Sequence, residues 1–429
     1  MLNLQLDNIY STKIGVRHGI KENKLQSFCD AKQPLVQKVF SSKNQYGYHF
    51  LTLPDAQANL KKIKAYVKEQ EKNGWKDIVV MGIGGSALGA IAVRDALINE
   101  FDKGKKLHVL DNIDPAYLAE FFASLDLAKT LFVVISKSGT TTETMTQYAL
   151  AKSMLLKKFP KDYQKHLLFI TDPKAGLLRK IAKAEKITAF DIPPKIGGRF
   201  SVLTNVGLIP CALAGVDISS LLKGAREMRE AIKRGKGILN PALVLAATQF
   251  ILDKKKNKPM TVLMPYSNYL FRVGDWYRQL LAESIGKSRG AGPTPINALG
   301  TTDQHSQLQL YNDGPNNKLI IFMRLLKHAK DPVVPEGILP EEIAFLSGKK
   351  MRTVIDAAYK GTSEALAQHK RPNLTIEVPK VDARHLGALF MLFEFQVALL
   401  GLLYKVDAFD QPGVEHSKKI TKQILKTEK

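Results

Sequence analysis

Runs of apolar residues without polar alternation recur at regular intervals in the first half of the chain. Four of these runs span residues 77–83, 106–111, 131–136 and 166–171. Such runs are typical of parallel strands that are covered on both faces of a sheet. Helix-forming segments of about 10 to 20 residues lie between them, so the pattern predicts a doubly wound α/β domain.

A segment rich in proline and glycine interrupts this alternation at residues 191–200. A helical stretch follows at about 220–253, and apolar runs return at residues 260–264, 318–323 and 373–378. We therefore expect two α/β units in tandem, each a doubly wound parallel sheet. The expected division of the chain is an unassigned N-terminal segment, a first unit, a second unit and a C-terminal helical segment, at residues 1–50, 51–215, 216–405 and 406–429.

The most apolar helical segment is Leu386 to Tyr404, which is as long as a membrane-spanning helix. Glu394 and Gln396 stand near its middle, and no charge asymmetry flanks it. Because polar groups at the centre of a bilayer are costly, a helix buried in a core or an interface is the favoured interpretation.

Hydroxyl groups are concentrated directly after the third apolar run. The segment Ser136-Lys137-Ser138-Gly139-Thr140-Thr141-Thr142-Glu143-Thr144 joins a predicted strand to a predicted helix. Ligands of α/β sheets bind at this end of the strands, and the start of a helix favours anions. A phosphate-binding loop is therefore the favoured interpretation, and an ordinary N-capping loop is the alternative.

A glycine cluster, residues 82–89, follows the first apolar run and opens a helical segment. Glycines allow the backbone to approach a ligand closely, and Ser86 adds a hydrogen-bond donor. A dinucleotide-binding turn is the alternative, but the third glycine does not have the G-x-G-x-x-G spacing. Together with the hydroxyl-rich loop, the cluster favours a sugar phosphate over a dinucleotide.

Composition narrows the class of protein. The chain has 429 residues and a net charge of +23, from 63 Lys and Arg against 40 Asp and Glu. The lysines are scattered and no nucleic-acid-binding signature is present, so a basic soluble surface is favoured over nucleic-acid binding. With two distant cysteines, Cys29 and Cys211, and no signal-peptide pattern at the start, we expect a cytoplasmic protein without a disulfide framework, zinc site or other metal.

Three later clusters carry reactive groups. They are Glu283-Ser284-Ile285-Gly286-Lys287, Asp303-Gln304-His305-Ser306, and Gln411-Pro412-Gly413-Val414-Glu415-His416-Ser417-Lys418. Taken alone, each has a structural explanation: a helix cap or ion pair for Glu283, a satisfied loop histidine for His305, and a solvated charge for Lys418.

In combination, these clusters resemble the glucose-6-phosphate isomerase family, also called phosphoglucose isomerase. The resemblance spans about residues 75–420 and includes Gly197-Gly198-Arg199-Phe200-Ser201 besides the clusters above. It implies two sugar-isomerase (SIS-type) domains, no cofactor, and a homodimer in which His305 reaches the site of the partner subunit. It also implies the reversible conversion of glucose 6-phosphate into fructose 6-phosphate, a step of glycolysis and gluconeogenesis.

The resemblance assigns roles by matching positions. Glu283 matches the catalytic base, Arg199 the cation beside the intermediate, and His305 and Lys418 the groups linked to ring opening. The matching substrate-binding positions are Gly85, Ser86, Ser136, Lys137, Ser138, Thr141, Thr144, Gln279 and Gln411.

The chemistry explains why these residue types are needed. A single carboxylate can move a proton between C2 and C1 through a cis-enediolate, and a positioned base typically contributes ~10²–10⁴-fold. A guanidinium stabilises the enediolate oxygen and cannot compete as a base.

One departure concerns the turn before Lys418, where the family commonly has Leu-Gly and this chain has His416-Ser417. Two alternatives stay open from the sequence. The first is an isomerase that also accepts mannose 6-phosphate, and the second is a sugar-phosphate sensor without turnover.

Overall fold

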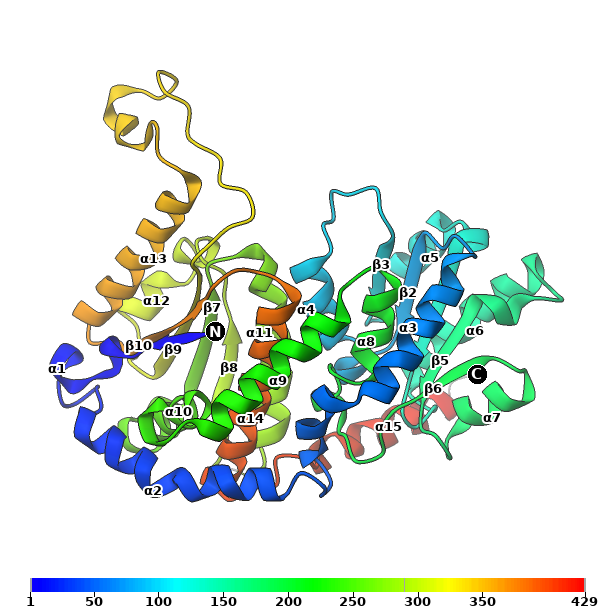
Figure 1. Ribbon diagram of the computed structural model, residues 1–429, viewed down its shortest axis with the longest axis horizontal. Helices are drawn as coiled ribbons and strands as arrows, with labels where there is room; N and C mark the ends of the chain where they lie inside the picture. The colour runs from blue at the N-terminus through cyan, green and yellow to red at the C-terminus, as the bar shows by residue number, and fades with distance from the viewer. Residues whose placement is uncertain (1, 289, 428–429) are drawn as a thin grey trace.

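The computed structural model describes residues 2–288 and 290–427, apart from the side chain of Glu415. Within this part of the chain, ten strands form two five-stranded sheets. Figure 1 shows the sheets side by side, with long helices between them and around them. The predicted architecture of two α/β units in tandem is therefore confirmed.

The first sheet has the strand order β3-β2-β4-β5-β6, and every neighbouring pair is parallel. Its strands are β2 (Asp77–Met81), β3 (Lys106–Leu110), β4 (Thr130–Ile135), β5 (Leu167–Thr171) and β6 (Thr188–Asp191). The helices that connect or flank them are α3 (Gln57–Glu71), α4 (Leu88–Leu97), α5 (Pro115–Ser124), α6 (Thr142–Lys158), α7 (Leu177–Ala184) and α8 (Asn205–Leu213). All six residues of the central strand β4 are buried, which explains its uninterrupted apolar sequence.

The second sheet has the order β1-β10-β9-β7-β8, in which β1 is antiparallel to β10 and the other pairs are parallel. Its strands are β7 (Met260–Pro265), β8 (Thr294–Asn297), β9 (Lys318–Leu325), β10 (Asn373–Val378) and β1 (Asn3–Gln5). Around it lie α1 (Ser11–Ile14), α2 (Glu22–Ser41), α9 (Ile218–Arg234), α10 (Pro241–Lys256), α11 (Phe271–Ile285), α12 (Leu308–Asn312), α13 (Met351–Gln368) and α14 (Ala383–Tyr404). The last helix of the chain is α15 (Glu415–Thr427).

Two details of the predicted element order need correction or completion. The stretch 220–253 is two helices, α9 and α10, because Gly235 ends the first and Asn240 caps the second. The unassigned N-terminal segment contains α2 and also supplies β1 to the edge of the second sheet. The bounds of the four expected segments stay a prediction.

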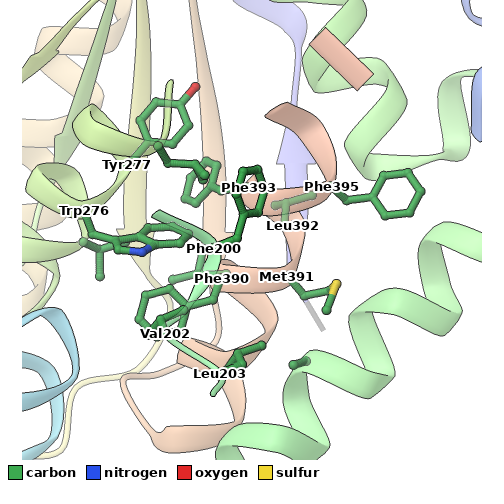
Figure 2. Packing of buried hydrophobic residues seen from close by; sticks show 14 of the residues in the cluster. Phe200, Val202, Leu203, Trp276, Tyr277, Phe390, Met391, Leu392, Phe393 and Phe395 are labelled. Carbon is green, nitrogen blue, oxygen red and sulfur yellow. The ribbon is translucent and has the colours of Figure 1, made fainter. Parts of the chain in front are cut away.

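One hydrophobic core joins the two units. It contains residues from one face of each sheet together with residues of the helices between the sheets, and two smaller cores cover the opposite faces. Figure 2 shows its centre, where Trp276 and Tyr277 of α11 pack against Phe390 and Phe393 of α14. Phe200 belongs to the same core, so the residues next to it and along α11 are held on a rigid support.

Helix α14 is the apolar segment discussed above. It is long and apolar enough to cross a membrane by length and composition, and 89% of its most apolar window is buried inside the protein. Its extensive packing against α9, α10 and α11 makes it the central core helix of the fold, as the sequence favours.

Candidate active site

The site lies at the carboxyl ends of β2 and β4. Strand β2 pairs with both β3 and β4, so the chain crosses from β2 to β3 in one direction and then returns past β2 to β4. The carboxyl ends at such a reversal diverge and leave a crevice, which is where ligands of α/β sheets bind. A cavity of about 630 Å³ occupies this position.

Twelve of the thirteen predicted site residues line this cavity. They are Gly85, Ser86, Ser136, Lys137, Ser138, Thr141, Thr144, Arg199, Gln279, Glu283, Gln411 and Lys418. They come from both α/β units and from the C-terminal segment, so only the folded chain brings them together. The cavity is thus an interdomain cleft with one hydroxyl-rich wall and one ionic wall.

The turn after β2 forms the floor of the cleft. Gly84 has φ +57°, and a Cβ atom there would lie 2.9 Å from Nε2 of Gln279. A Cβ atom on Gly85 would lie 2.2 Å from the backbone of Gly198. The glycines are therefore required because the second unit and the segment at Gly198 approach this turn closely, and a dinucleotide is not needed to explain them.

The hydroxyl-rich loop closes on itself through its side chains. Oγ of Ser136 accepts a hydrogen bond from the amide of Gly139 (3.0 Å) and lies 2.9 Å from Oγ1 of Thr141. Oγ of Ser138 accepts from the amide and the hydroxyl of Thr140, at 3.2 and 3.1 Å. These bonds fix the loop conformation and direct it toward the start of α6.

The start of α6 differs from that of the other described α-helices whose N-cap residue is Asp, Asn or Thr. Thr141 is its N-cap residue, yet the side chain makes no capping hydrogen bond in the described structure. Helices α5, α8, α9, α10 and α14 are all capped by an Asp, Asn or Thr side chain. Capping therefore does not account for the hydroxyls of this loop, and the first amides of α6 remain available at the cleft.

Thr144 lies in the first turn of α6 and lines the cleft. Its side chain is 1% exposed, and its Oγ1 has no hydrogen-bond partner among the described residues. A buried hydroxyl without a partner is costly, so a ligand oxygen at this position would satisfy it.

Lys137 lines the cleft but directs its ammonium group to the backbone. Its Nζ donates to the carbonyl oxygens of Pro194 (2.8 Å) and Ile196 (3.1 Å). Burial lowers its pKa, against the opposing effect of Asp172. Lys137 thus joins the loop to the segment before Arg199 and contributes positive charge to the wall.

Arg199 is the central cation of the opposite wall and is 2% exposed. Its Nε donates to Oγ of Ser284 (2.7 Å), and its Nη2 donates to the carbonyl oxygens of Ala408 (2.6 Å) and Asp410 (2.8 Å). Its Nη1 donates to Oε1 of Gln411 (3.0 Å) and to Oε2 of Glu283 (3.2 Å). Burial lowers its pKa and Glu283 opposes this effect, so the guanidinium is held rigidly beside a carboxylate.

Glu283 stands near the end of α11 with its side chain 29% exposed. Its Oε1 accepts a hydrogen bond from Nε2 of Gln279, one turn earlier, at 2.9 Å. Its Oε2 accepts from Arg199. The carboxylate is therefore oriented by two donors while one side remains open to the cleft.

The C-terminal segment completes the cleft. Lys287 forms an ion pair with Asp410 (2.8 Å), which fixes this segment beside the end of α11. Gln411 and Val414 then line the cleft, and Lys418 reaches it from the first turn of α15. A segment remote in sequence is thus tied to the residues around Glu283.

His305 is not among the described residues that line the cleft. It follows the 3-10 helix Thr302–Gln304 after β8, and its side chain is exposed. The predicted site residues therefore separate into twelve that share one cavity and one that points to solvent from the second unit.

Sequence reasoning missed several residues that shape the cleft. Oγ of Ser201 donates to the carbonyl oxygens of Gly85 (3.1 Å) and Gly198 (2.6 Å), and Ser284 binds Arg199. Asp172 also lines the cleft, and hydrogen bonds from the backbone amide of Ala175 lower its pKa. Ser201 and Ser284 stand within motifs quoted above but were given no role there, whereas Asp172 follows β5 outside any quoted motif.

The chain is similar to known proteins over nearly its whole length. A profile of the phosphoglucose isomerase family matches residues 51–429. A glucose-6-phosphate isomerase from Carboxydothermus hydrogenoformans is 42% identical over 419 residues, which cover 93% of this chain and 89% of that protein.

Solved structures agree with this finding. A hypothetical protein from Thermus thermophilus has a TM-score of 0.90 at 33% identity, covering 99% of this chain and 100% of that one. A glucose-6-phosphate isomerase from Chlamydia trachomatis has a TM-score of 0.86, covering 99% of this chain and 88% of that one, but at 22% identity it supports the fold alone. The chain belongs to the phosphoglucose isomerase family.

Proposed function

We propose that this protein interconverts glucose 6-phosphate and fructose 6-phosphate by proton transfer through a cis-enediolate, without a metal ion or cofactor. The observation that carries the proposal is the Glu283–Arg199 pair, which faces the hydroxyl-rich loop across one cleft. A carboxylate, a buried guanidinium and a phosphate-binding helix start are the groups that this reaction requires.

The phosphate group of the sugar is proposed to bind at the start of α6. The uncapped amides of α6 and the unpartnered Oγ1 of Thr144 support this position. Ser136, Ser138 and Thr141 offer hydroxyls in the same loop. Lys137 adds positive charge to the wall while its ammonium group donates to the backbone of Pro194. The helix start provides both hydrogen-bond donors and a favourable dipole for the phosphate.

The sugar carbons then extend from the loop toward Glu283. Gly85 and Ser86 form the floor beneath them, and Gln279 and Gln411 stand beside the carboxylate and the guanidinium. Glu283 removes the proton from C2 and returns it to C1 on the same face. Arg199 stabilises the negative charge that develops on the enediolate oxygen, and its five hydrogen bonds keep it from moving.

Ring opening is assigned to Lys418 and His305. Lys418 is already at the cleft, but the described chain leaves His305 exposed in the second unit. We therefore propose a homodimer in which His305 completes the site of the partner subunit. A proton relay must come within hydrogen-bond distance of the ring oxygen, which a partner's histidine can satisfy.

An exposed apolar arm supports the dimer. Residues 326–350 project from the second unit between β9 and α13 (Figure 1). Ile338 is 74% exposed and Phe345 67% exposed, although side chains of this type are normally buried. A second copy of the chain that covers this arm would remove these apolar surfaces from water.

The first test of the reaction is a coupled assay with fructose 6-phosphate and detection of glucose 6-phosphate. We expect turnover in the wild type and a loss of about 10²–10⁴-fold in kcat for Glu283→Gln, with KM nearly unchanged. Glu120→Gln, on the exposed face of α5, is the matched control and should be fully active. Near-normal turnover of Glu283→Gln would remove this residue as the base.

The assay also separates the alternatives. Comparable turnover of mannose 6-phosphate would assign a broader isomerase. Binding of fructose 6-phosphate without turnover in either protein would assign a sensor instead.

The dimer is tested by complementation between two inactive variants. Glu283→Gln and His305→Ala are unfolded together and refolded as a mixture. In a mixed dimer, the site with the intact Glu283 receives the intact His305, so one of its two sites is active. Random pairing should restore about one quarter of wild-type activity. Absence of recovery in mixed dimers, confirmed as dimers by light scattering, would contradict the shared site.

A cytoplasmic location belongs to the same proposal. Cys29 and Cys211 are both free thiols and both buried, which agrees with a reducing compartment.

A further inference from the structure

A dense group of cations lies at the amino ends of the second sheet, and we call it the basic cluster. It consists of Arg17, His18, Lys256, Lys258, Lys318 and Arg371. Lys258 and Arg371 stand two residues before β7 and β10, and Lys318 is the first residue of β9. Because the strands are parallel, their amino ends meet at one edge, opposite to the carboxyl ends of the same sheet.

Lys258 is the most deeply placed member, at 3% exposed. Its Nζ donates to the carbonyl oxygen of Asn316 and lies 3.4 Å from Nδ1 of His18. Nδ1 of His18 also lies 3.3 Å from Nδ2 of Asn316. The turn after α1 is thus tied to the amino ends of β7 and β9 through neutral groups.

The other members also bind neutral acceptors. Lys256 donates to the carbonyl oxygen of Val16 (2.6 Å), and Nε of Arg371 donates to that of Asn312 (2.8 Å). Lys318, which is 8% exposed, donates to the carbonyl oxygen of Pro315 (3.1 Å) and to Oδ1 of Asn317 (2.7 Å). Each contact gives a Lys or Arg nitrogen a hydrogen-bond acceptor but does not neutralise its positive charge.

Across the described chain, none of the five lysines and arginines of the cluster forms an ion pair with a carboxylate. The acidic side chain that acts on Arg371 is Asp313, which is exposed and forms its own contact with His369 at 3.4 Å. Nη1 of Arg371 is buried without a partner among the described residues. Buried cations without counter-charges are energetically costly. The positive charge at this end of the sheet is therefore uncompensated, and a bound anion would stabilise it.

The pKa values reflect the same imbalance. Burial lowers the pKa of Lys258 to about 8, and Arg371, Arg17, Lys256 and Lys318 all act in the same direction. Burial and then Lys258 lower the pKa of His18. An anion bound among these groups would offset the repulsion between their positive charges and raise their pKa values.

We propose that the basic cluster is a second anion-binding site, separate from the cleft, that takes a compact multivalent anion made of phosphate groups. Ammonium and guanidinium groups from four chain segments converge here, as polyphosphate recognition requires. Arg17 is exposed, so the cluster is open to solvent on that side. None of the six residues of the basic cluster lines the cleft, so a ligand of the cluster would act on stability without competing for substrate.

The test is a calorimetric titration with pyrophosphate while an equilibrium mixture of glucose and fructose 6-phosphates saturates the cleft. We expect wild-type protein to bind one equivalent per chain with Kd below about 1 mM, and more weakly as NaCl is raised. Lys258→Met should weaken this binding at least tenfold. Lys255→Met, an exposed lysine of the same segment, is the matched control and should bind as the wild type does.

A second variant guards against misfolding of Lys258→Met. Arg17→Ala combined with Lys256→Ala changes side chains at the rim of the cluster and should also weaken binding tenfold or more. Equal binding by wild type and both variants, or no binding by wild type, would overturn the proposal. Isomerase activity is measured on the same samples and should be unchanged, so a failure of the proposed reaction would be seen separately.

A final experiment distinguishes the two possible sources of the phosphate groups. The titration is repeated with a nucleoside triphosphate at the same ionic strength. Tighter binding than pyrophosphate would assign the cluster to a nucleotide, and equal or weaker binding would assign it to free polyphosphate.

Discussion

The two sheets have the same strand order over four strands, but only the first carries the hydroxyl-rich loop that we propose to bind phosphate. The order β3-β2-β4-β5 in the first sheet corresponds to β8-β7-β9-β10 in the second. In both, the first of these strands in sequence leads through a short 3-10 helix into a long helix, α4 or α11. The shared topology therefore places a crevice in each unit, and the residues in the loops decide what each crevice does.

The second crevice shows the difference. A cavity of about 640 Å³ lies at the ends of β3 and β7 and is lined by Arg94, Asp95, Ser267, Asn268 and His328 among others. Two of its ionic groups pair with each other, because Asp95 lies 2.6 Å from Arg94, and Asp95 also lies 3.6 Å from Arg272 outside the cavity. After β9 the chain continues into the long arm and not into a hydroxyl-rich loop. The second unit contributes its helix α11 to the cleft of the first and keeps no equivalent anion cradle of its own among the described residues.

The largest expected effect follows from substitution of Arg199, whose hydrogen bonds connect the first unit to α11 and to the C-terminal segment. Arg199→Gln removes the guanidinium that contacts α11 and the C-terminal segment, and with it the charge that we propose to stabilise the enediolate. We expect kcat to fall about 10²–10³-fold in the coupled assay. Arg199→Lys keeps the charge but loses most of the five hydrogen bonds, and should fall between. Full activity in both variants would show that the cleft between the two units catalyses the reaction without Arg199.

A smaller effect, on KM, should show directly that the two crevices differ in function. Ser138→Ala in the first unit removes a hydroxyl from the proposed phosphate loop, and we expect KM to rise about 10-fold, as for a lost hydrogen bond to a charged group. Ser267→Ala removes a hydroxyl from the crevice of the second unit, after β7, and should leave KM unchanged. The initial rate as a function of fructose 6-phosphate gives both values. Equal KM values for the two variants would mean that the units do not differ in this way.

The smallest effect concerns the amino edge of the second sheet. The pKa of Lys258 in the folded protein is lowered to about 8, whereas an unfolded lysine titrates near 10.5. Between these values the unfolded chain binds more protons, so the contribution of this group to stability rises with pH. In urea unfolding without polyanions, wild-type protein should gain about 1 kcal/mol over Lys258→Met between pH 8 and 9. Parallel pH profiles of the two proteins would refute the lowered pKa of Lys258.

The strands that the sequence predicts correctly are the buried ones together with the edge strand β3, which is partly buried and has five residues. The seven apolar runs correspond to β2, β3, β4, β5, β7, β9 and β10, with ends within a few residues. The strands that it misses are β1, β6 and β8, which have three or four residues each and lie at sheet edges. Edge strands are partly exposed, so selection for apolar side chains is weak and the pattern is lost.

The site follows the same division between local and tertiary information. The hydroxyl-rich loop is contiguous in sequence, and its position between a strand and a helix is visible there. The contacts of Arg199 are not, because Ser284, Ala408 and Gln411 lie far away along the chain. The clustering of cations around Lys258 is equally invisible, since a scattered distribution of lysines in sequence says nothing about which of them meet.

The two α/β units, the buried strands, the family resemblance and the residue types of the cleft can all be read from the chain before it folds, because they depend on local pattern and contiguous motifs. Which side chains meet can be read only from the folded chain, where α11 of the second unit lies beside the loop of the first, His305 is exposed, and the cations gather at one end of the second sheet. Hydrophobic burial favours each element where its sequence is apolar, whereas charges and hydrogen bonds act over a few ångströms and can form only after the core has brought distant segments together.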